Sequence, residues 1–199
     1  MKLFYSPGAC SQAAHILLHE TELPHESEAV DLRTHRTASG ADYYAINPKG
    51  SVPALQIGDE VLTENGAVLQ YIGDKAGSET LLPSTGMERY RVIELLAYLG
   101  SDVHKGFGPL WNPAASDDAK QAARDLVGKK FDFLENALDG RDYLLGPSMS
   151  VADPYLFAML GWTGMFGIDL AKWPRLSAFR QRVMERPTVR AVMKAEGLA

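Results

Sequence analysis

The sequence predicts a small α/β unit over residues 1–76, followed by an all-helical unit that begins near residue 86. Strand and helix patterns alternate through the first part, whereas no convincing strand pattern occurs in residues 87–199. The charge changes at the same place: residues 1–80 carry a formal net charge of −6, and residues 81–199 carry +1. A chain of 199 residues is long enough for one large domain or two modest ones.

The first unit is expected to be a mixed sheet with helices packed on it. Ser6-Pro7-Gly8 stops an apolar first strand, and Gly58-Asp59 marks the turn of a hairpin. The expected elements are a strand at 1–5, a helix at 11–22, a strand at 26–30, a polar loop at 31–40, a short helix at 41–48, a hairpin at 53–64 and a helix that ends near Gly77.

The second unit follows a stretch with the composition of a linker, residues 77–86. Apolar residues at helical spacing predict helices within residues 87–111, 119–138, 151–166 and 176–187. The chain shows no internal repeat and no low-complexity tract.

Composition and charge exclude several classes of function. Apolar residues make up 46% of the chain and charged residues 23%, which is typical of a globular protein in water. With a net charge of −5 and no basic stripe, nucleic acid is a poor partner. No apolar run is long enough for a membrane helix, and the N-terminus lacks the apolar core of a secretory signal. One cysteine cannot form an internal disulfide, so we expect a cytoplasmic protein.

That single cysteine, Cys10, follows the first strand and its turn and stands where a helix begins. Unpaired backbone N–H groups and the helix dipole at such a place favour an anion, either the protein's own thiolate or that of a ligand. The alternative is a small residue in a tight turn, since free cysteines are often merely buried. A dithiol redox pair is excluded because the residue three positions later is Ala13.

Two further features lie in the α/β unit. Pro53 opens a strand, and a cis Val52–Pro53 peptide would turn the Val52 backbone groups toward a ligand, although a trans proline is the ordinary state at a strand start. Glu64 and Asn65 precede the apolar positions of a helix. Asn65 could cap that helix, and Glu64 could hold a cationic ammonium group or serve only in capping.

Together these motifs resemble the cytosolic glutathione transferases, and the stretches YSPGACS, AINPKGSVPAL and HKGFGPLWNP resemble the bacterial beta class. SVADPYLFAML, residues 150–160, is similar to that family's Ser-x-x-Asp capping motif, in which Ser150 and Asp153 pair across a first helical turn. The resemblance covers essentially the whole chain. It implies a thioredoxin-like glutathione-binding domain with a mixed four-stranded sheet at 1–77. An all-helical domain at 86–199 would carry much of the electrophile site.

The resemblance also implies the residues of a glutathione site. Cys10 would lie beside the glutathione sulfur, and the Val52 backbone would pair with the cysteinyl part. Glu64 and Asn65 would hold the γ-glutamyl group, although Asn65 replaces the more usual Ser, Thr or Gly. His35 stands where the class often has a lysine, which puts its contact with the glycyl carboxylate in doubt.

The remaining implied residues lie in the helical unit. His104 would reach the sulfur region, with Lys105 beside it. Ser101 and Asp102 would approach the glutathione bound by the partner subunit, so a homodimer is expected. Ala97 replaces an asparagine of the class and removes one possible contact across that interface. Without the resemblance, His104 is an ordinary polar residue on a helix.

The implied activity is conjugation of reduced glutathione, a co-substrate, to a small apolar electrophile, with no metal, no nucleic acid and no membrane involved. The helix start would favour a thiolate, and so would His104 in its protonated form. Cys10 could instead exchange disulfides with glutathione, in a glutathione-dependent disulfide reductase or peroxidase. A non-catalytic ligand carrier or protein-interaction module is a third alternative. Six apolar residues could line the electrophile cleft or, for most of them, form the helical core: Phe107, Leu110, Trp111, Tyr155, Trp162 and Phe166.

Overall fold

The computed structural model describes residues 1–199 and contains one five-stranded mixed sheet, with the strand order β3-β2-β1-β4-β5. β1 and β2 are parallel because helix α1 crosses between them, while β4 and β5 form the antiparallel hairpin. Gly58, at a φ of 61°, makes the hairpin turn. The strands are β1 (Lys2–Tyr5), β2 (Glu26–Asp31), β3 (Arg36–Thr37), β4 (Ala54–Ile57) and β5 (Glu60–Thr63).

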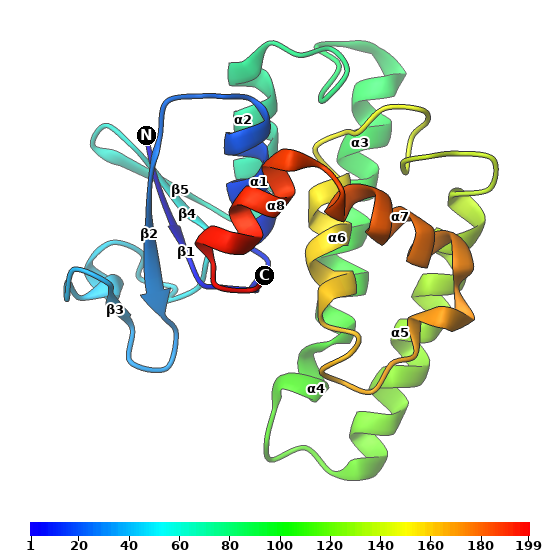
Figure 1. The fold of residues 1–199 in the computed structure, drawn as a ribbon. Helices are drawn as coiled ribbons and strands as arrows, with labels where there is room; N and C mark the ends of the chain where they lie inside the picture. The colour runs from blue at the N-terminus through cyan, green and yellow to red at the C-terminus, as the bar shows by residue number, and fades with distance from the viewer.

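Helices and loops make up the rest of the chain, and the helices after α2 form a separate layer beside the sheet (Figure 1). The α-helices are α1 (Gln12–Glu20), α2 (Asn65–Ala76), α3 (Gly86–Tyr98), α4 (Gly108–Trp111), α5 (Asp117–Ala137), α6 (Asp153–Gly161), α7 (Pro174–Met184) and α8 (Pro187–Ala195). Shorter turns occur at η1 (Tyr43–Ala45) and η3 (Leu170–Lys172), and a π-helical segment, η2, spans Leu99–His104. None of these helices is both long and apolar enough to cross a bilayer.

Helix α1 joins the sheet to the helical layer. It packs on β1 and α2 and also on α6 and α8, so its residues from Gln12 to Leu18 are all buried. α8 returns from the far end of the chain to cover α1, which brings the C-terminus close to the end of β1 (Figure 1). A hydrogen bond from the Gly8 N–H to Glu196 Oε2, 2.9 Å long, ties the two places together.

The Ser-x-x-Asp motif begins α6, which is buried along nearly its whole length. The backbone N–H and the hydroxyl of Ser150 both donate to Asp153 Oδ2 at 2.7 Å. The Leu144 N–H donates to the other carboxylate oxygen at 2.9 Å. Burial of the carboxyl group raises the pKa of Asp153 to about 6. The sequence prediction of this pairing is confirmed.

Most predicted elements are confirmed, and the differences have local causes. The sheet has a fifth strand because two residues of the expected polar loop, Arg36 and Thr37, pair with the end of β2. The helical run over 87–111 is divided into α3, the π-helical segment and α4. The helix expected within 176–187 ends at Met184, and Pro187 occupies the first turn of α8, where its missing N–H costs nothing.

The predicted cap of α2 by Asn65 is wrong. Asn65 is the first residue inside the helix, and its side-chain Nδ2 donates to the backbone oxygen of Cys10 at 2.8 Å. The other end follows the expectation, because Gly77 adopts a left-handed conformation, with φ of 62°, just after the last turn.

Candidate functional site

A cavity of about 560 Å³ opens between the loop after β1 and the helical layer. It brings together three residues predicted for the site, Cys10, Val52 and His104, which are far apart in the sequence. The cavity is lined by Ser6, Pro7, Gly8, Ala9, Cys10, Leu32, Gly50, Ser51, Val52, His104, Trp111, Trp162, Met165 and Leu198. Loops of the sheet unit thus form one wall, and aromatic and aliphatic side chains of the helical layer form the other.

The loop between β1 and α1 is held from both sides. Within the loop, the Ser6 N–H donates to Ser11 Oγ at 3.1 Å. From the helical layer, Trp162 Nε1 donates to the Gly8 oxygen at 2.8 Å, and Glu196 accepts from the Gly8 N–H. Cys10 therefore sits in a turn whose backbone groups are largely engaged before any ligand arrives.

The Cys10 thiol is held as a neutral donor. Its Sγ lies 3.3 Å from the Val52 backbone oxygen, to which it donates. Burial raises the pKa of Cys10 to about 12, and the hydrogen bonds from the Cys10 and Ser11 backbone N–H groups only partly oppose that rise. The expectation that the helix start favours a thiolate of Cys10 is not met, because removal from water outweighs the local dipole.

The Val52–Pro53 peptide is cis, so the loop that the resemblance implied is present. Two hydrogen bonds fix Ser51, the residue before this peptide. Tyr43 Oη and Asn47 Nδ2 both donate to the Ser51 backbone oxygen, at 2.8 and 2.7 Å. Val52 is nearly buried yet borders the cavity. The cysteine loop and the proline loop consequently present backbone groups to the same space.

His104 lies across the cavity from these loops, and its Nδ1 is 2.8 Å from the hydroxyl of Tyr155. Burial and the neighbouring Lys105 lower the pKa of His104, so its imidazole is neutral near pH 7. The condition under which His104 would favour a thiolate, its protonated form, is therefore not met near pH 7. Burial raises the pKa of Tyr155, so that its hydroxyl keeps its proton and can donate to Nδ1.

Sequence reasoning missed the positioning of His104 by Tyr155. It placed Tyr155 among the residues that could line an apolar cleft or form the helical core, and the side chain is in the core, 3% exposed. No spacing signal links two residues 51 positions apart on different helices. The useful hint was chemical: a tyrosine in a buried helix needs a partner for its hydroxyl.

Glu64 and Asn65 lie at the start of α2, outside the lining of this cavity. Glu64 has φ of 71°, a left-handed conformation that costs a residue other than glycine about 1 kcal/mol or more and is concentrated at functional sites. Its exposed carboxylate forms an ion pair with Lys49 Nζ at 2.7 Å. Asn65 Oδ1 is buried without a hydrogen-bond partner, so this position retains an unused acceptor.

The other predicted residues surround the site less closely. His35 stacks on Tyr44, with ring centroids 4.3 Å apart, and both lie against Gly50 at the cavity rim. Ser101 Oγ donates to Asp102 Oδ2 at 2.8 Å on the π-helical segment, away from the cavity lining. Lys105 is exposed and also outside the lining.

The six aromatic and apolar candidates for the electrophile cleft divide into two groups. Trp111 and Trp162 line the cavity, with ring centroids 5.5 Å apart in an edge-to-face arrangement. The others belong to the core or pack against it: Phe107, Leu110, Tyr155 and Phe166. The interpretation that most of the six are core residues agrees with this division.

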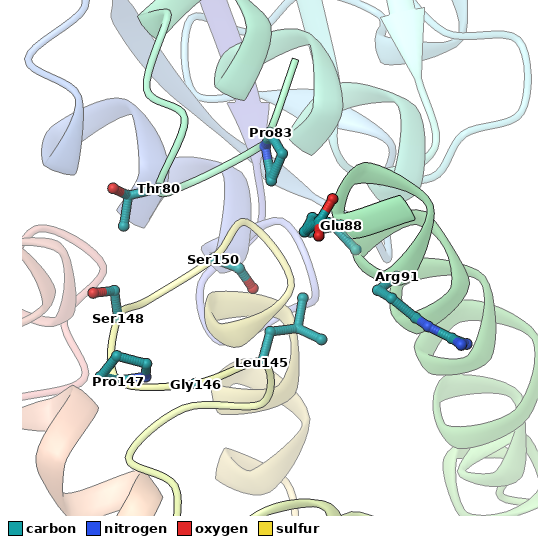
Figure 2. A pocket seen from close by; sticks show the side chains of 10 residues that line it. Thr80, Pro83, Glu88, Arg91, Leu145, Gly146, Pro147, Ser148 and Ser150 are labelled. Atoms are coloured by element: carbon teal, nitrogen blue, oxygen red, sulfur yellow. The ribbon is translucent and has the colours of Figure 1, made fainter. Parts of the chain in front are cut away.

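A second cavity, of about 290 Å³, lies between the start of α3 and the segment 145–150 (Figure 2). Figure 2 shows Glu88 facing Leu145 across it, while the Arg91 side chain extends away, toward its partner Glu94. No residue predicted for the site lines this cavity. It lacks a thiol or an imidazole, so the first cavity is the candidate site.

The fold and site define a class: a thioredoxin-like sheet unit with a cysteine before its first helix and a cis-proline loop, joined to a helical layer. Comparison with known proteins agrees with this class. The family model described as "Glutathione S-transferase, N-terminal domain" matches residues 1–74, and "Glutathione S-transferase, C-terminal domain" matches residues 101–187. The chain is 41% identical to glutathione S-transferase GstA of Escherichia coli O157:H7 over the full length of both proteins. It belongs to the glutathione S-transferase family.

Two solved structures are similar over their whole length. A sphingomonad glutathione S-transferase in complex with glutathione shares 48% identity with the chain, with a TM-score of 0.95 and complete coverage of both. A bacterial beta-class glutathione S-transferase from Sphingomonas chungbukensis shares 46% identity, also with a TM-score of 0.95 and complete coverage. The predicted resemblance to the bacterial beta class is thereby confirmed.

Proposed function

We propose that the protein conjugates reduced glutathione to small apolar electrophiles. The observation that carries the proposal is the single cavity in which the Cys10 thiol, the Val52 backbone and the His104 imidazole meet beside the indole of Trp111. The similar sphingomonad protein has been solved with glutathione bound, which supports glutathione as the co-substrate. The polar loops suit a peptide, and the aromatic wall suits an apolar second substrate.

The residue roles follow from the chemistry of each part of glutathione. We assign the Val52 backbone to the cysteinyl unit, as an extended peptide pairs with an exposed strand edge. Glu64 would bind the γ-glutamyl ammonium, exchanging its exposed partner Lys49 for the ligand. The unpartnered Oδ1 of Asn65 is suited to accept a hydrogen bond from the same group.

The assignments of the other residues rest on charge and position. His35, beside Gly50 at the rim, is assigned to the glycyl carboxylate, with Lys105 as a further cation near the His104 side. Ser101 and Asp102 are assigned to the glutathione of the partner subunit in a homodimer. Sedimentation of the purified protein would test that assembly, because a monomer would leave both residues without a role.

In the conjugation step, the glutathione sulfur is the nucleophile. The thiolate attacks an electrophilic carbon, a carbon–sulfur bond forms, and the leaving group departs with the electron pair of its bond to that carbon. A thiol whose pKa is about 12 is ionised to only about 10⁻⁵ at pH 7. Cys10 is therefore suited to donate a hydrogen bond to the glutathione sulfur, and a neutral His104 can donate from Nε2 when Tyr155 donates to Nδ1.

Disulfide exchange is a second candidate, favoured by the presence of a cysteine rather than a hydroxyl residue in the cavity. The thiolate of Cys10 would attack the glutathione sulfur of a mixed disulfide, and the substrate thiolate would leave. A second glutathione thiolate would then attack the glutathione sulfur of the Cys10 mixed disulfide, which releases oxidised glutathione with the Cys10 thiolate as the leaving group. This route requires glutathione, or another bound group, to lower the pKa of Cys10.

Calorimetric titration with reduced glutathione, followed by assays with an activated aryl chloride and with a glutathione mixed disulfide, tests both candidates. We expect one glutathione per subunit and conjugation that survives in Cys10→Ala with altered affinity. If conjugation is lost in both Cys10→Ala and Cys10→Ser, Cys10 is the reacting group. If millimolar glutathione does not bind, the transferase proposal fails and a ligand carrier or interaction module becomes the better interpretation.

The organisation and location of the protein are also proposals. We propose a glutathione-binding domain at residues 1–77 and a helical domain at 86–199, which the two family matches support. Limited proteolysis within the segment 77–86 would test the boundary. We propose a cytoplasmic location, because reduced glutathione and an unpaired cysteine both belong to a reducing compartment.

A further inference from the structure

Three histidines gather around the second half of α1 and the segment that follows it, outside the cavity that contains Cys10. His15 and His19 are one helical turn apart on the same face, and His25 approaches them from the segment before β2. One ring nitrogen of each histidine lies within 4.8 Å of those of the other two. Neighbouring rings are 5.3 Å apart between His15 and His19 and 5.2 Å apart between His19 and His25.

Two of these imidazoles have their Nδ1 atoms fixed by groups that can only accept a proton. Nδ1 of His15 is 2.9 Å from Glu196 Oε1, and both side chains are buried. Nδ1 of His25 is 2.8 Å from the backbone oxygen of Leu23. Because a carboxylate and a carbonyl accept, each Nδ1 carries a hydrogen, which leaves Nε2 as the atom through which each ring could bind an ion.

This arrangement is the usual support of a metal-binding histidine. Such residues donate their second ring N–H to a carboxylate or a backbone carbonyl, which fixes the tautomer and the ring orientation. Glu196 is itself held, because its Oε2 accepts from Gln12 Nε2 at 3.1 Å and from the Gly8 N–H at 2.9 Å. The Glu196 carboxylate would therefore stabilise the positive charge of a metal ion bound to His15.

We propose that His15, His19 and His25 form a binding site for a divalent transition-metal ion, with zinc as the best-suited ion and water as the fourth ligand. Three imidazoles with one open position suit Zn²⁺. Tetrahedral zinc would bring the nitrogens to about 3.3 Å from one another, given zinc–nitrogen bonds of about 2.0–2.1 Å. The three nitrogens must therefore move closer together when the ion binds, and the half-buried His19 and His25 leave an entry path from solvent.

The ionisable groups that face the cluster are the three histidines themselves, Glu196 from the C-terminal segment, and Tyr5, whose ring lies 4.6 Å from that of His15.

The site stands apart from the transferase chemistry. None of the three histidines lines the cavity that contains Cys10, and none was predicted to bind glutathione. The metal-free conjugation mechanism therefore stays as proposed. Failure of either proposal leaves the other intact.

The test is calorimetric titration of untagged, chelator-washed protein with Zn²⁺, and with Co²⁺ as a visible-absorption probe. All proteins carry Cys10→Ser, so that the cavity thiol cannot bind the ion. We expect one Zn²⁺ per subunit, a visible spectrum of tetrahedral Co²⁺, and a melting temperature raised by Zn²⁺. His19→Gln and His25→Gln should each lower the affinity by about 10- to 100-fold.

His15 is unsuitable as the main variant because it is buried against Glu196 and its loss could unfold the chain. His35→Gln is the matched control, since it removes a histidine outside the cluster and should leave zinc affinity unchanged. The proposal is overturned if the parent shows no saturable zinc binding. It is equally overturned if His19→Gln and His25→Gln bind Zn²⁺ as tightly as the parent, or if His35→Gln weakens binding as much as they do.

Discussion

Replacement of Asp153 by alanine should be among the most destabilising single changes in the chain. The Asp153 carboxylate is completely buried and accepts three hydrogen bonds, two from Ser150 and one from the Leu144 N–H. Without it, three buried donors lose their acceptor, at about 1–3 kcal/mol each. Rotation of the Ser150 hydroxyl and entry of water relieve part of this, so we expect a loss of about 3–5 kcal/mol.

The assay is urea unfolding followed by circular dichroism at one fixed subunit concentration, since any assembly would shift the midpoint. A loss of this size is a large part of the usual stability of a domain, so Ser150→Ala provides a graded second variant. It removes the hydroxyl, which donates to Asp153 and accepts from the Ala152 N–H at 3.3 Å. Its expected loss is about 1–2 kcal/mol.

Asp142→Ala is the matched control, because Asp142 is an exposed acid whose ion pair with Arg182 should contribute about 0–1 kcal/mol. The reasoning is refuted if Asp153→Ala costs less than Asp142→Ala at an unchanged urea slope. It is also refuted if Ser150→Ala costs as much as Asp153→Ala, because the carboxylate would then add nothing beyond the hydroxyl.

Three further predictions concern single side chains. The hydrogen bond from Lys2 is the main cause that lowers the pKa of Glu28 to about 2, so the ionised carboxylate stabilises the fold fully above its ordinary pKa of 4.5 and loses this contribution as the pH falls toward 2. In Glu28→Gln, the free energy of unfolding in urea should therefore depend less on pH between 4.5 and 2. An unchanged pH dependence would contradict the assignment. Tyr155→Phe removes the hydrogen-bond partner of His104 and should lower the kcat of conjugation by about two- to tenfold, because one hydrogen bond contributes about 0.5–1.5 kcal/mol. The pH profile of kcat should shift as well. A variant that loses only thermal stability would show that Tyr155 has a purely structural role. Glu64→Gln should weaken glutathione binding, measured by calorimetry, by about tenfold. The melting temperature should stay nearly unchanged, because the ion pair of Glu64 with Lys49 is exposed. Equal glutathione affinity in the variant would show that Glu64 is not part of the site.

Local signals in the sequence predicted most of the fold. The turn at Gly58-Asp59, the helix stop at Gly77 and the Ser150–Asp153 pairing depend on residues within a few positions of one another, so their structure follows from short-range sterics and hydrogen bonds. The exceptions were equally instructive. β3 has only two residues, too few for a periodic pattern. The start of α8 was missed because its first residue is Pro187, and a proline occurs both after the end of a helix and in the first turn of one.

The candidate site was predictable only in part. The motifs around Cys10, Val52 and Glu64 predicted residues of the site, and the family resemblance implied a role for each. The protonation states were not predictable, because desolvation depends on every group packed around a side chain. Burial keeps the thiol of Cys10 protonated, the opposite of what its position at a helix start suggested, and it keeps the imidazole of His104 neutral.

By itself, the sequence determined the order of elements, the division between a mixed sheet and helices, and the family, since these depend on local periodicity and short motifs. Only the tertiary structure decided which distant groups meet. Trp162 reaches the Gly8 backbone, Tyr155 positions His104, and Glu196 holds His15. These contacts arise because burial of α1 between the sheet, α6 and α8 brings together segments that no local pattern connects.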